Sequence, residues 1–326
     1  MVGIYAAVAA TVFVLTAVSL RFLIPKLRSM KMGQKILDIG PRWHKSKEGT
    51  PTMGGISFLA SIILVLTATL VILHISGESL NALPLVLTLL LALGNGIIGI
   101  IDDLTKFRKQ QNEGLTAPQK FALQLAMAGA FIALLNLYGE IDTSLAIPFT
   151  GIELELGWFY YIFALVFITG IINSVNLTDG IDGLASSVTL VVALFLSLLA
   201  FVSYGLELAL LGAAMVGATL GFLVYNFYPA RVFMGDTGSL FIGGLVAGSA
   251  FMIDSPLVIA IASVIYISEA LSDIIQVGFY KLTHKRVFKM APIHHHFEKC
   301  GWSEIKIVIV FSLVTLIFSA VGFFAA

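Results

Sequence analysis

Charged side chains are scarce in this chain, and their scarcity decides which class of protein it encodes. Asp, Glu, Lys and Arg together make up 12% of the residues, whereas 58% are hydrophobic. Soluble domains carry roughly 25% charged residues, so a water-soluble globular fold is excluded. We therefore predict an all-α polytopic membrane protein.

Several other features are rare or missing. Cys300 is the only cysteine, which excludes an intramolecular disulfide. No basic segment precedes the first apolar stretch, so we expect a retained helix and not a cleaved signal peptide. The chain has no repeat of fixed period and no convincing match between its halves, unlike many transporters. We therefore expect a single domain over residues 1–326.

Long apolar stretches follow one another along the whole chain. A transmembrane helix needs about 20 mostly apolar residues. Ten stretches meet this requirement, near 3–24, 54–75, 82–101, 119–138, 158–175, 184–204, 208–226, 238–254, 256–280 and 305–325. They leave no room for a soluble domain, so we expect one bundle of ten transmembrane helices.

Lys and Arg separate the connections between these helices into two groups. They are concentrated in the connections 25–53, 102–118 and 281–304, and they are absent near 76–81, 139–157, 205–207 and 254–256. The basic residues of the first connection are Lys26, Arg28, Lys31, Lys35, Arg42, Lys45 and Lys47. Short loops rich in Lys and Arg stay on the cytoplasmic side. We expect the three basic connections inside and both termini outside.

The first motif is the pair Asp102-Asp103, where the third predicted helix reaches the cytoplasm. Adjacent carboxylates repel each other, so such a pair usually needs a cation, a basic partner or a shared proton. The cation would be Mg²⁺ or a basic group of a reactant. The alternative interpretation is a solvated helix end, although acids at a helix C-terminus oppose the helix dipole.

The second motif lies between the fifth and sixth predicted helices. Four polar residues recur at every third position, a spacing that aligns side chains on a 3₁₀ turn: Asn173, Asn176, Asp179 and Asp182. Gly180 and Gly183 permit a tight backbone beside them. Such polar density next to apolar helices indicates a lining that faces water, a metal or a polar ligand. The alternative is that Asn176 and Asp182 cap helices.

The third motif is Gly235-Asp236-Thr237-Gly238-Ser239, just before the eighth predicted helix. Backbone amides and hydroxyls at a helix start are typical of an anion cradle. A carboxylate beside phosphates is tolerable mainly when a divalent cation lies between them, and Mg²⁺ is commonly held this way. Asp236 is therefore the preferred metal ligand. The alternative is an Asx turn with a Ser cap.

The fourth motif is the run His294-His295-His296 in the last inner connection. Three consecutive histidines cannot point the same way, so a zinc site from this run alone is improbable. Phosphate binding by one or two of them suits the run better, and a solvated basic loop is the alternative. Glu269 and Asp273 lie four residues apart and share a helix face, where we expect some pairing with inner-loop lysines.

Start signals place several helix N-termini on the same inner side. They are Thr52, Pro118, Asp182 and Ser239. Positive helix ends, lysines, histidines and carboxylates around one basin favour a polyphosphate substrate with Mg²⁺.

Five segments, in order, resemble the polyprenyl-phosphate N-acetylhexosamine-1-phosphate transferases. They are 49–55, Asp102-Asp103, 173–185, 233–239 and 292–298. The last segment, Pro-Ile-His-His-His-Phe-Glu, is similar to the muramoyl-pentapeptide branch of this family, although Ile293 stands where many members have Met. The resemblance covers most of the chain.

The resemblance implies transfer of phospho-MurNAc-pentapeptide from UDP-MurNAc-pentapeptide to undecaprenyl phosphate, which yields lipid I and UMP. It implies a Mg²⁺-dependent enzyme of the bacterial cytoplasmic membrane that acts in peptidoglycan synthesis, with no nucleic-acid partner and with a homodimer as a possibility. Asp236 would hold the metal, and Asp102 would act as a base or orient the lipid phosphate. Asp103 and Asp179 would support the same centre. A double displacement through an aspartyl phosphate stays open.

The resemblance also implies a set of substrate-binding residues. Phe233 would stack on uracil. The remaining members of this set are Lys47, Thr52, Asn173, Asn176, Gly180, Asp182, Asn226, His294, His295 and His296.

Two other functions remain open at this point. A relative that uses UDP-N-acetylglucosamine would carry a different histidine segment. A transporter of anionic solutes would place polar residues near the middle of the bilayer and would break its helices at paired positions.

Overall fold

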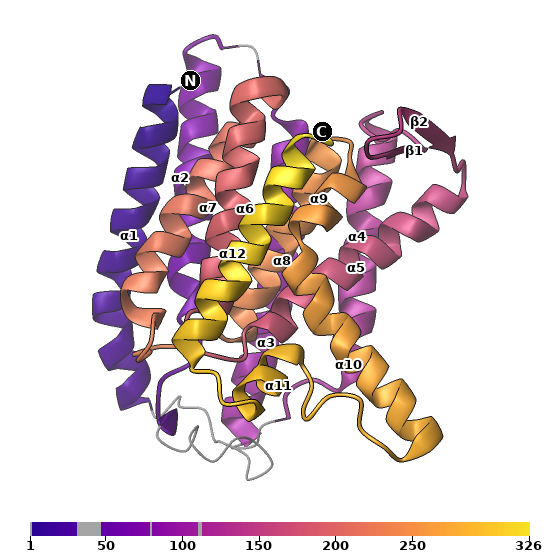
Figure 1. The fold of residues 1–326 in the computed structure, drawn as a ribbon. Coiled ribbons are helices and arrows are strands. Elements are labelled where there is room, and N and C mark those ends of the chain that lie inside the picture. Colours follow the sequence, from indigo (N-terminus) through magenta and orange to yellow (C-terminus); the bar gives the residue numbers. More distant parts are fainter. Residues whose placement is uncertain (1, 31–46, 79, 110–112) are drawn as a thin grey trace.

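The computed structural model describes residues 2–30, 47–78, 80–109 and 113–326 as a bundle of long helices (Figure 1). The helices are α1 (Val2–Ser29), α2 (Gly55–Ile75), α3 (Leu83–Lys109), α4 (Ala117–Leu137), α5 (Phe159–Thr178), α6 (Leu184–Leu199), α7 (Gly205–Asn226), α8 (Gly235–Met252), α9 (Pro256–Ala262), α10 (Val264–Thr283), α11 (Ile293–Lys299) and α12 (Glu304–Phe323). Four basic residues of the predicted connection 25–53 lie outside the described residues: Lys31, Lys35, Arg42 and Lys45.

Seven helices of the described chain are long and apolar enough to cross a membrane, or eight if the bent pair α9 and α10 counts as one. The protein is therefore an all-α polytopic membrane protein. One of the seven is the run Leu184–Asn226, which contains α6, a π-helical turn at Ala200–Tyr204 and α7. The two helices pack against each other, so this run folds back on itself. The connection expected at 205–207 lies within α7.

The segment 256–280 is not the single straight helix that the sequence predicts. α9 and α10 meet at an angle of 81°. The break lies at Ser263, whose ψ of 16° departs from the helical value of about −42°. Beyond the break, α10 leaves the bundle, and its C-terminal end projects to one side (Figure 1).

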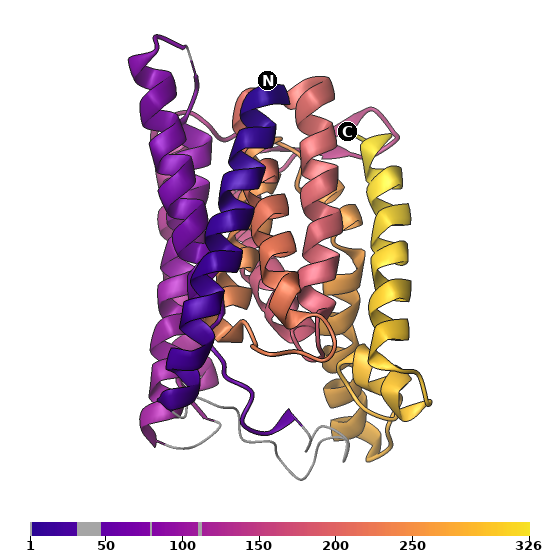
Figure 2. The same cartoon turned by 90° about the vertical axis from the view of Figure 1, so that its left-hand side faces the viewer.

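A small β-hairpin joins α4 to α5, where the sequence predicts only a connection. β1 (Ser144–Ile147) pairs with β2 (Ile152–Glu155) in antiparallel register, with Ser144 opposite Glu155. The alternation of apolar and acidic residues in β2 was the available signal, because side chains of a strand alternate between its faces. The hairpin lies at the same end of the bundle as both termini (Figures 1 and 2).

α8 begins with the third motif and is surrounded by other helices of the bundle. It packs against α2, α3, α5 and α6, and its residues from Thr237 to Phe251 are all buried. Small residues make this enclosure possible: a Cβ on Gly243 would lie 2.7 Å from the Cα of Ile172 in α5, and one on Gly244 would lie 2.6 Å from the Cα of Ala92 in α3. The close contacts fix the first turn of α8 relative to its neighbours.

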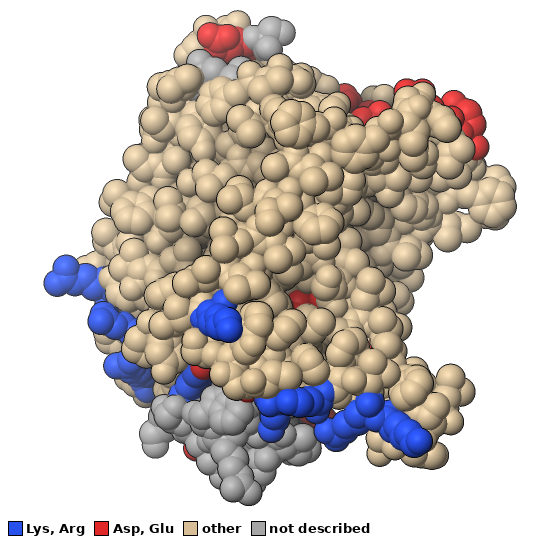
Figure 3. All heavy atoms as spheres, viewed as in Figure 1, with Lys and Arg blue, Asp and Glu red and all other residues tan. Residues whose placement is uncertain are grey.

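Exposed charges separate along the bundle axis. In the view of Figure 3, Lys and Arg occupy the lower end of the molecule, whereas the upper end shows Asp and Glu and no basic side chain. The lower end also holds the last turns of α3 and the start of α8, which contain the acidic motifs.

Candidate active site

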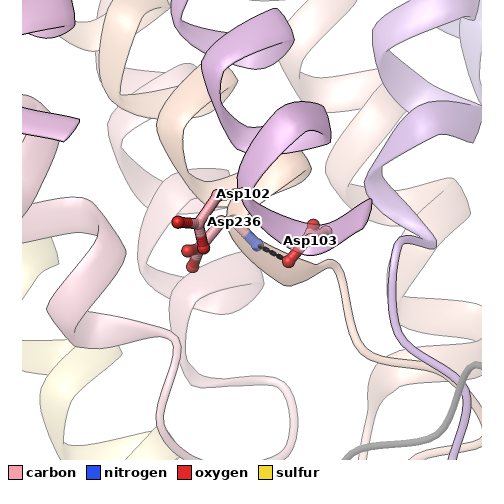
Figure 4. A group of neighbouring side chains, drawn as sticks. All are labelled: Asp102, Asp103 and Asp236. Atoms are coloured by element: carbon pink, nitrogen blue, oxygen red, sulfur yellow. Dashed lines mark hydrogen bonds between the residues drawn. The ribbon is translucent and has the colours of Figure 1, made fainter. Parts of the chain in front are cut away.

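Three aspartates from two helices meet at the basic end of the bundle (Figure 4). Asp102 and Asp103 lie in α3, and Asp236 lies in the first turn of α8. One carboxylate oxygen of each lies within 4.8 Å of the others. α3 continues to Lys109 and both of its aspartates are buried, so the interpretation as a solvated helix end is wrong.

Two lysines offset part of the negative charge of this cluster. Lys106 Nζ lies 2.7 Å from Asp102 Oδ2 and 2.7 Å from Asp236 Oδ2. Lys120 Nζ, from the first turn of α4, lies 2.9 Å from Asp236 Oδ2. Neither lysine was predicted to belong to the site. The spacing of four residues between Asp102 and Lys106 on one helix was a usable signal, whereas Lys120 had none.

Asp103 holds the start of α8. Its Oδ2 accepts hydrogen bonds from the Thr237 backbone N–H at 3.0 Å and from the Thr237 hydroxyl at 2.8 Å, and its Oδ1 accepts from the Asp236 N–H at 3.3 Å. A carboxylate at a helix N-terminus is favoured by the helix dipole. Two of the backbone amides that were predicted to cradle a phosphate, those of Asp236 and Thr237, are therefore bound to Asp103. The predicted start at Ser239 is also wrong, because α8 begins at Gly235.

Asn176 orients the Asp236 carboxylate. Its Nδ2 donates to Asp236 Oδ1 at 2.9 Å and to Ser239 Oγ at 2.7 Å, and its Oδ1 accepts from Lys120 Nζ at 3.2 Å. Asn176 lies inside α5 and caps no helix. Asn173 and Asn176 lie in the α-helix α5, so the predicted alignment on a 3₁₀ turn is wrong. Asn173 Nδ2 donates to Gln124 Oε1 at 2.8 Å, and the structure does not bring Asn173 into the cluster.

The polar segment after α5 lies beside the same cluster. Burial raises the pKa of the Asp179 carboxyl well above its usual range, and the negative charges of Asp236, Asp103 and Asp182 add to the effect. Gly180 follows at an exposed position.

Lys47 and Asp182 belong to a second ionic group. Lys47 Nζ lies 2.7 Å from Asp182 Oδ1 and 2.6 Å from Oε2 of Glu304 at the start of α12. Asp182 Oδ2 accepts from the Ala230 N–H at 2.8 Å. The interpretation of Asp182 as a cap of α6 is wrong, because Gly183 is the N-cap and receives no side-chain bond. Glu304 was not found in the sequence analysis.

Asn226, Phe233 and Thr52 shape the loop before α8. Asn226 is buried and donates to the Val232 carbonyl at 3.0 Å, so it holds this loop. The Phe233 carbonyl accepts a hydrogen bond from the Gly54 N–H at 2.9 Å, which attaches the segment before α2 to this loop. The Phe233 ring is partly exposed. Thr52 lies beside Gly235, where φ is +72° and a Cβ would approach Thr52 Oγ1 to 2.8 Å. α2 begins at Gly55, so Thr52 is not its cap.

The three histidines lie on α11 and have different surroundings. His294 is 1% exposed, so a solvated loop does not describe it, and its Nδ1 lies 3.0 Å from Glu269 Oε2. His295 Nδ1 lies 2.6 Å from Glu298 Oε2, and His296 Nδ1 accepts from the Lys289 N–H at 3.0 Å. The structure gives Glu269 a histidine partner, contrary to the expected lysine.

The three-aspartate cluster has a donor set that could hold a metal ion. Hard divalent cations such as Mg²⁺ prefer carboxylate oxygens. Asp103 already accepts three hydrogen bonds from the start of α8. Asp102 and Asp236 instead share one cationic partner, the ammonium group of Lys106.

Comparisons with known proteins agree with this geometry. The family model described as glycosyl transferase family 4 matches residues 85–254, and a phospho-N-acetylmuramoyl-pentapeptide-transferase signature matches residues 47–59. The chain is 44% identical over 311 residues to a phospho-N-acetylmuramoyl-pentapeptide-transferase of Clostridium perfringens (strain 13 / Type A), covering 95% of each protein. It is 47% identical over 301 residues to one of Clostridium kluyveri (strain ATCC 8527), covering 92% of each.

Proposed function

The chain belongs to the phospho-N-acetylmuramoyl-pentapeptide-transferase family, and on this premise we propose that it transfers phospho-MurNAc-pentapeptide from UDP-MurNAc-pentapeptide to undecaprenyl phosphate. The products are lipid I and UMP, and the location is the bacterial cytoplasmic membrane. The observation that carries the proposal is the 44% sequence identity over 95% of the chain. The carboxylate and lysine cluster at the basic end supports the same chemistry.

Phosphoryl transfer depends mainly on positioning and on charge neutralisation. Lys106 and Lys120 both contact Asp236. Their ammonium groups would donate hydrogen bonds to the substrate phosphates next to this carboxylate. Asn176 keeps the Asp236 carboxylate in one orientation. Asp103 fixes the start of α8, so that Asp236 stays close to Asp102.

Mg²⁺ is proposed as the cofactor, with Asp236 and Asp102 as its ligands. Bound Mg²⁺ would neutralise charge on the diphosphate. Asp102 faces the acceptor phosphate, either as a base or as an orienting group. Because a phosphate monoester has a second pKa near 6, the acceptor is already largely ionised at neutral pH, which favours orientation.

The proposed membrane arrangement has ten crossings. α6, α7 and α8 each cross, and α9 with α10 forms one bent crossing, in addition to α1, α2, α3, α4, α5 and α12. The basic end faces the cytoplasm and both termini face outward. This arrangement places the aspartate cluster at the inner membrane surface, where a soluble nucleotide and a lipid phosphate meet.

The transporter interpretation finds less support. Its polar residues would lie at mid-bilayer and its broken helices would be paired. In the described chain Lys, Arg and the aspartate cluster lie at one end of the bundle, and the bent pair α9 and α10 is the one broken span.

The test is UMP release by the purified protein with undecaprenyl phosphate and Mg²⁺. UDP-MurNAc-pentapeptide and UDP-N-acetylglucosamine are supplied in separate reactions. We expect release with the muramoyl substrate alone. Release with the glucosamine substrate alone would move the protein to the sister branch, and release with neither from folded protein would refute the transferase assignment.

A further inference from the structure

Glu269 of α10 and His294 of α11 form a buried pair in which Glu269 has no assigned role. Their side chains are 0% and 1% exposed. Glu269 Oε2 lies 3.0 Å from His294 Nδ1 and also accepts the His294 backbone N–H at 3.3 Å. One carboxylate oxygen therefore holds both the backbone and the ring of the same histidine.

The opposite edge of the imidazole faces the candidate active site. A Cβ built on Gly180 would collide with His294 Nε2, so this nitrogen lies directly against Gly180. Gly180 is exposed and follows Asp179, whose carboxyl is within electrostatic reach of Asp236 and Asp103. Any larger residue at position 180 would displace the ring.

His294 Nε2 has no hydrogen-bond partner among the residues that the structure describes. A buried polar atom without a partner is destabilising, and native structures keep few of them. The Glu269 carboxylate accepts from Nδ1, so Nδ1 carries a hydrogen and Nε2 is the atom left for another contact. Carboxylates that bind one ring nitrogen in this way set the orientation and tautomer of a histidine.

We propose that Glu269 is a positioning residue that holds His294 by Nδ1 and presents the Nε2 lone pair beside Gly180 as the acceptor of a hydrogen bond from a hydroxyl or N–H group of the nucleotide substrate. This inference rests on the proposed function. Glu269 lies against Nδ1, on the edge of the ring away from Gly180. Its effect passes through the imidazole, which stands between the carboxylate and Gly180.

The first test compares Glu269→Gln with Asp273→Asn. Asp273 lies one turn further along α10 and is half-buried, which makes it a matched control. We expect Glu269→Gln to lower kcat/KM for UDP-MurNAc-pentapeptide by about 10- to 100-fold, as for carboxylates that orient metal-bound histidines. The KM for undecaprenyl phosphate should stay unchanged, and Asp273→Asn should change neither parameter more than about twofold.

The second test asks whether Glu269 acts through His294. In a His294→Asn background, Glu269→Gln should cause no further loss, because residues that act as a unit are non-additive. If Glu269→Gln fails to fold, Gly180→Ala tests the same contact from the other side and should lower kcat/KM for the nucleotide substrate alone. Equal effects of Glu269→Gln and Asp273→Asn, or additive losses with His294→Asn, would overturn the proposal.

A readout independent of turnover separates this proposal from the proposed function. The ¹⁵N resonances of His294, identified by their loss in His294→Asn, should show hydrogen on Nδ1 in the wild type and a changed tautomer in Glu269→Gln. Unchanged resonances would refute the positioning role even in an active enzyme. A wild-type protein that releases no UMP but shows the tautomer change would refute only the transferase assignment.

Discussion

At the scale of single residues, each of the three clustered aspartates has a defined partner. Asp102 contacts Lys106 and accepts the Leu115 N–H at 2.7 Å, whereas Asp103 is bound by Thr237. Asp236 contacts two lysines and one amide. Desolvated charges are tolerated only when they are paired and hydrogen-bonded. These contacts therefore make a concentration of carboxyl groups tolerable in a mostly apolar protein.

The Asp236→Asn substitution tests the central carboxylate. It should reduce turnover by at least about 10²- to 10³-fold, because it removes a charge that the transition state needs, and should abolish the dependence on Mg²⁺. Steady-state UMP release over a Mg²⁺ titration measures both effects. Asp254→Asn, just beyond the other end of α8, is the control and should leave turnover unchanged. Activity of Asp236→Asn within twofold of wild type would remove its metal-binding role.

At the scale of elements, the contact between α3 and α8 positions the site. Gly99 of α3 lies against the backbone of α8, and a Cβ there would collide with the Asp236 carbonyl. The atoms nearest to a Cβ built on Gly94 of the same helix belong to the Met127 side chain. The two glycines thus differ in what an added methyl group would displace.

Gly99→Ala should lower both stability and turnover, whereas Gly94→Ala should be mild. Overpacking against rigid backbone costs typically about 1–3 kcal/mol, and a flexible methionine side chain can move aside. Melting temperature and UMP release of the two variants in the same detergent measure the difference. Equal behaviour of the two variants would show that the close approach of α3 to α8 does not position Asp236.

At the scale of the whole molecule, the polarity of the bundle sets its orientation. Basic residues lie at the end that holds the aspartate cluster, and the hairpin and both termini lie at the other end (Figures 1 and 3). The single cysteine, Cys300, is exposed at the basic end, just after α11. This placement makes it a natural probe of sidedness.

A membrane-impermeant maleimide should label Cys300 in inverted vesicles and not in intact spheroplasts. The positive-inside rule predicts this result, because the surrounding connection is rich in Lys. A Cys300→Ser, Ser76→Cys variant moves the thiol to the exposed end of α2 and should reverse the pattern. Labelling of Cys300 in spheroplasts would invert the proposed topology.

Local patterns in the sequence were sufficient for the class and for most elements. Low charge and long apolar stretches predicted a polytopic helical protein, because about 20 apolar residues span a bilayer. Pro118 was the predicted start signal of α4, and the structure adds a full capping box there between Thr116 and Gln119. The five ordered motifs were enough to indicate the family, and Asp102, Asp103 and Asp236 do converge.

Contacts between distant segments were decided by the tertiary structure alone. Lys120 contacts the aspartate cluster because helix packing brings α4 beside it. Glu304 contacts Lys47 because packing brings the start of α12 beside that residue. The bend at Ser263 and the pairing of Glu269 with His294 likewise have no local signal. The physical reason is that hydrophobicity and capping act over a few neighbouring residues, whereas partner choice depends on which helix surfaces fit together in three dimensions.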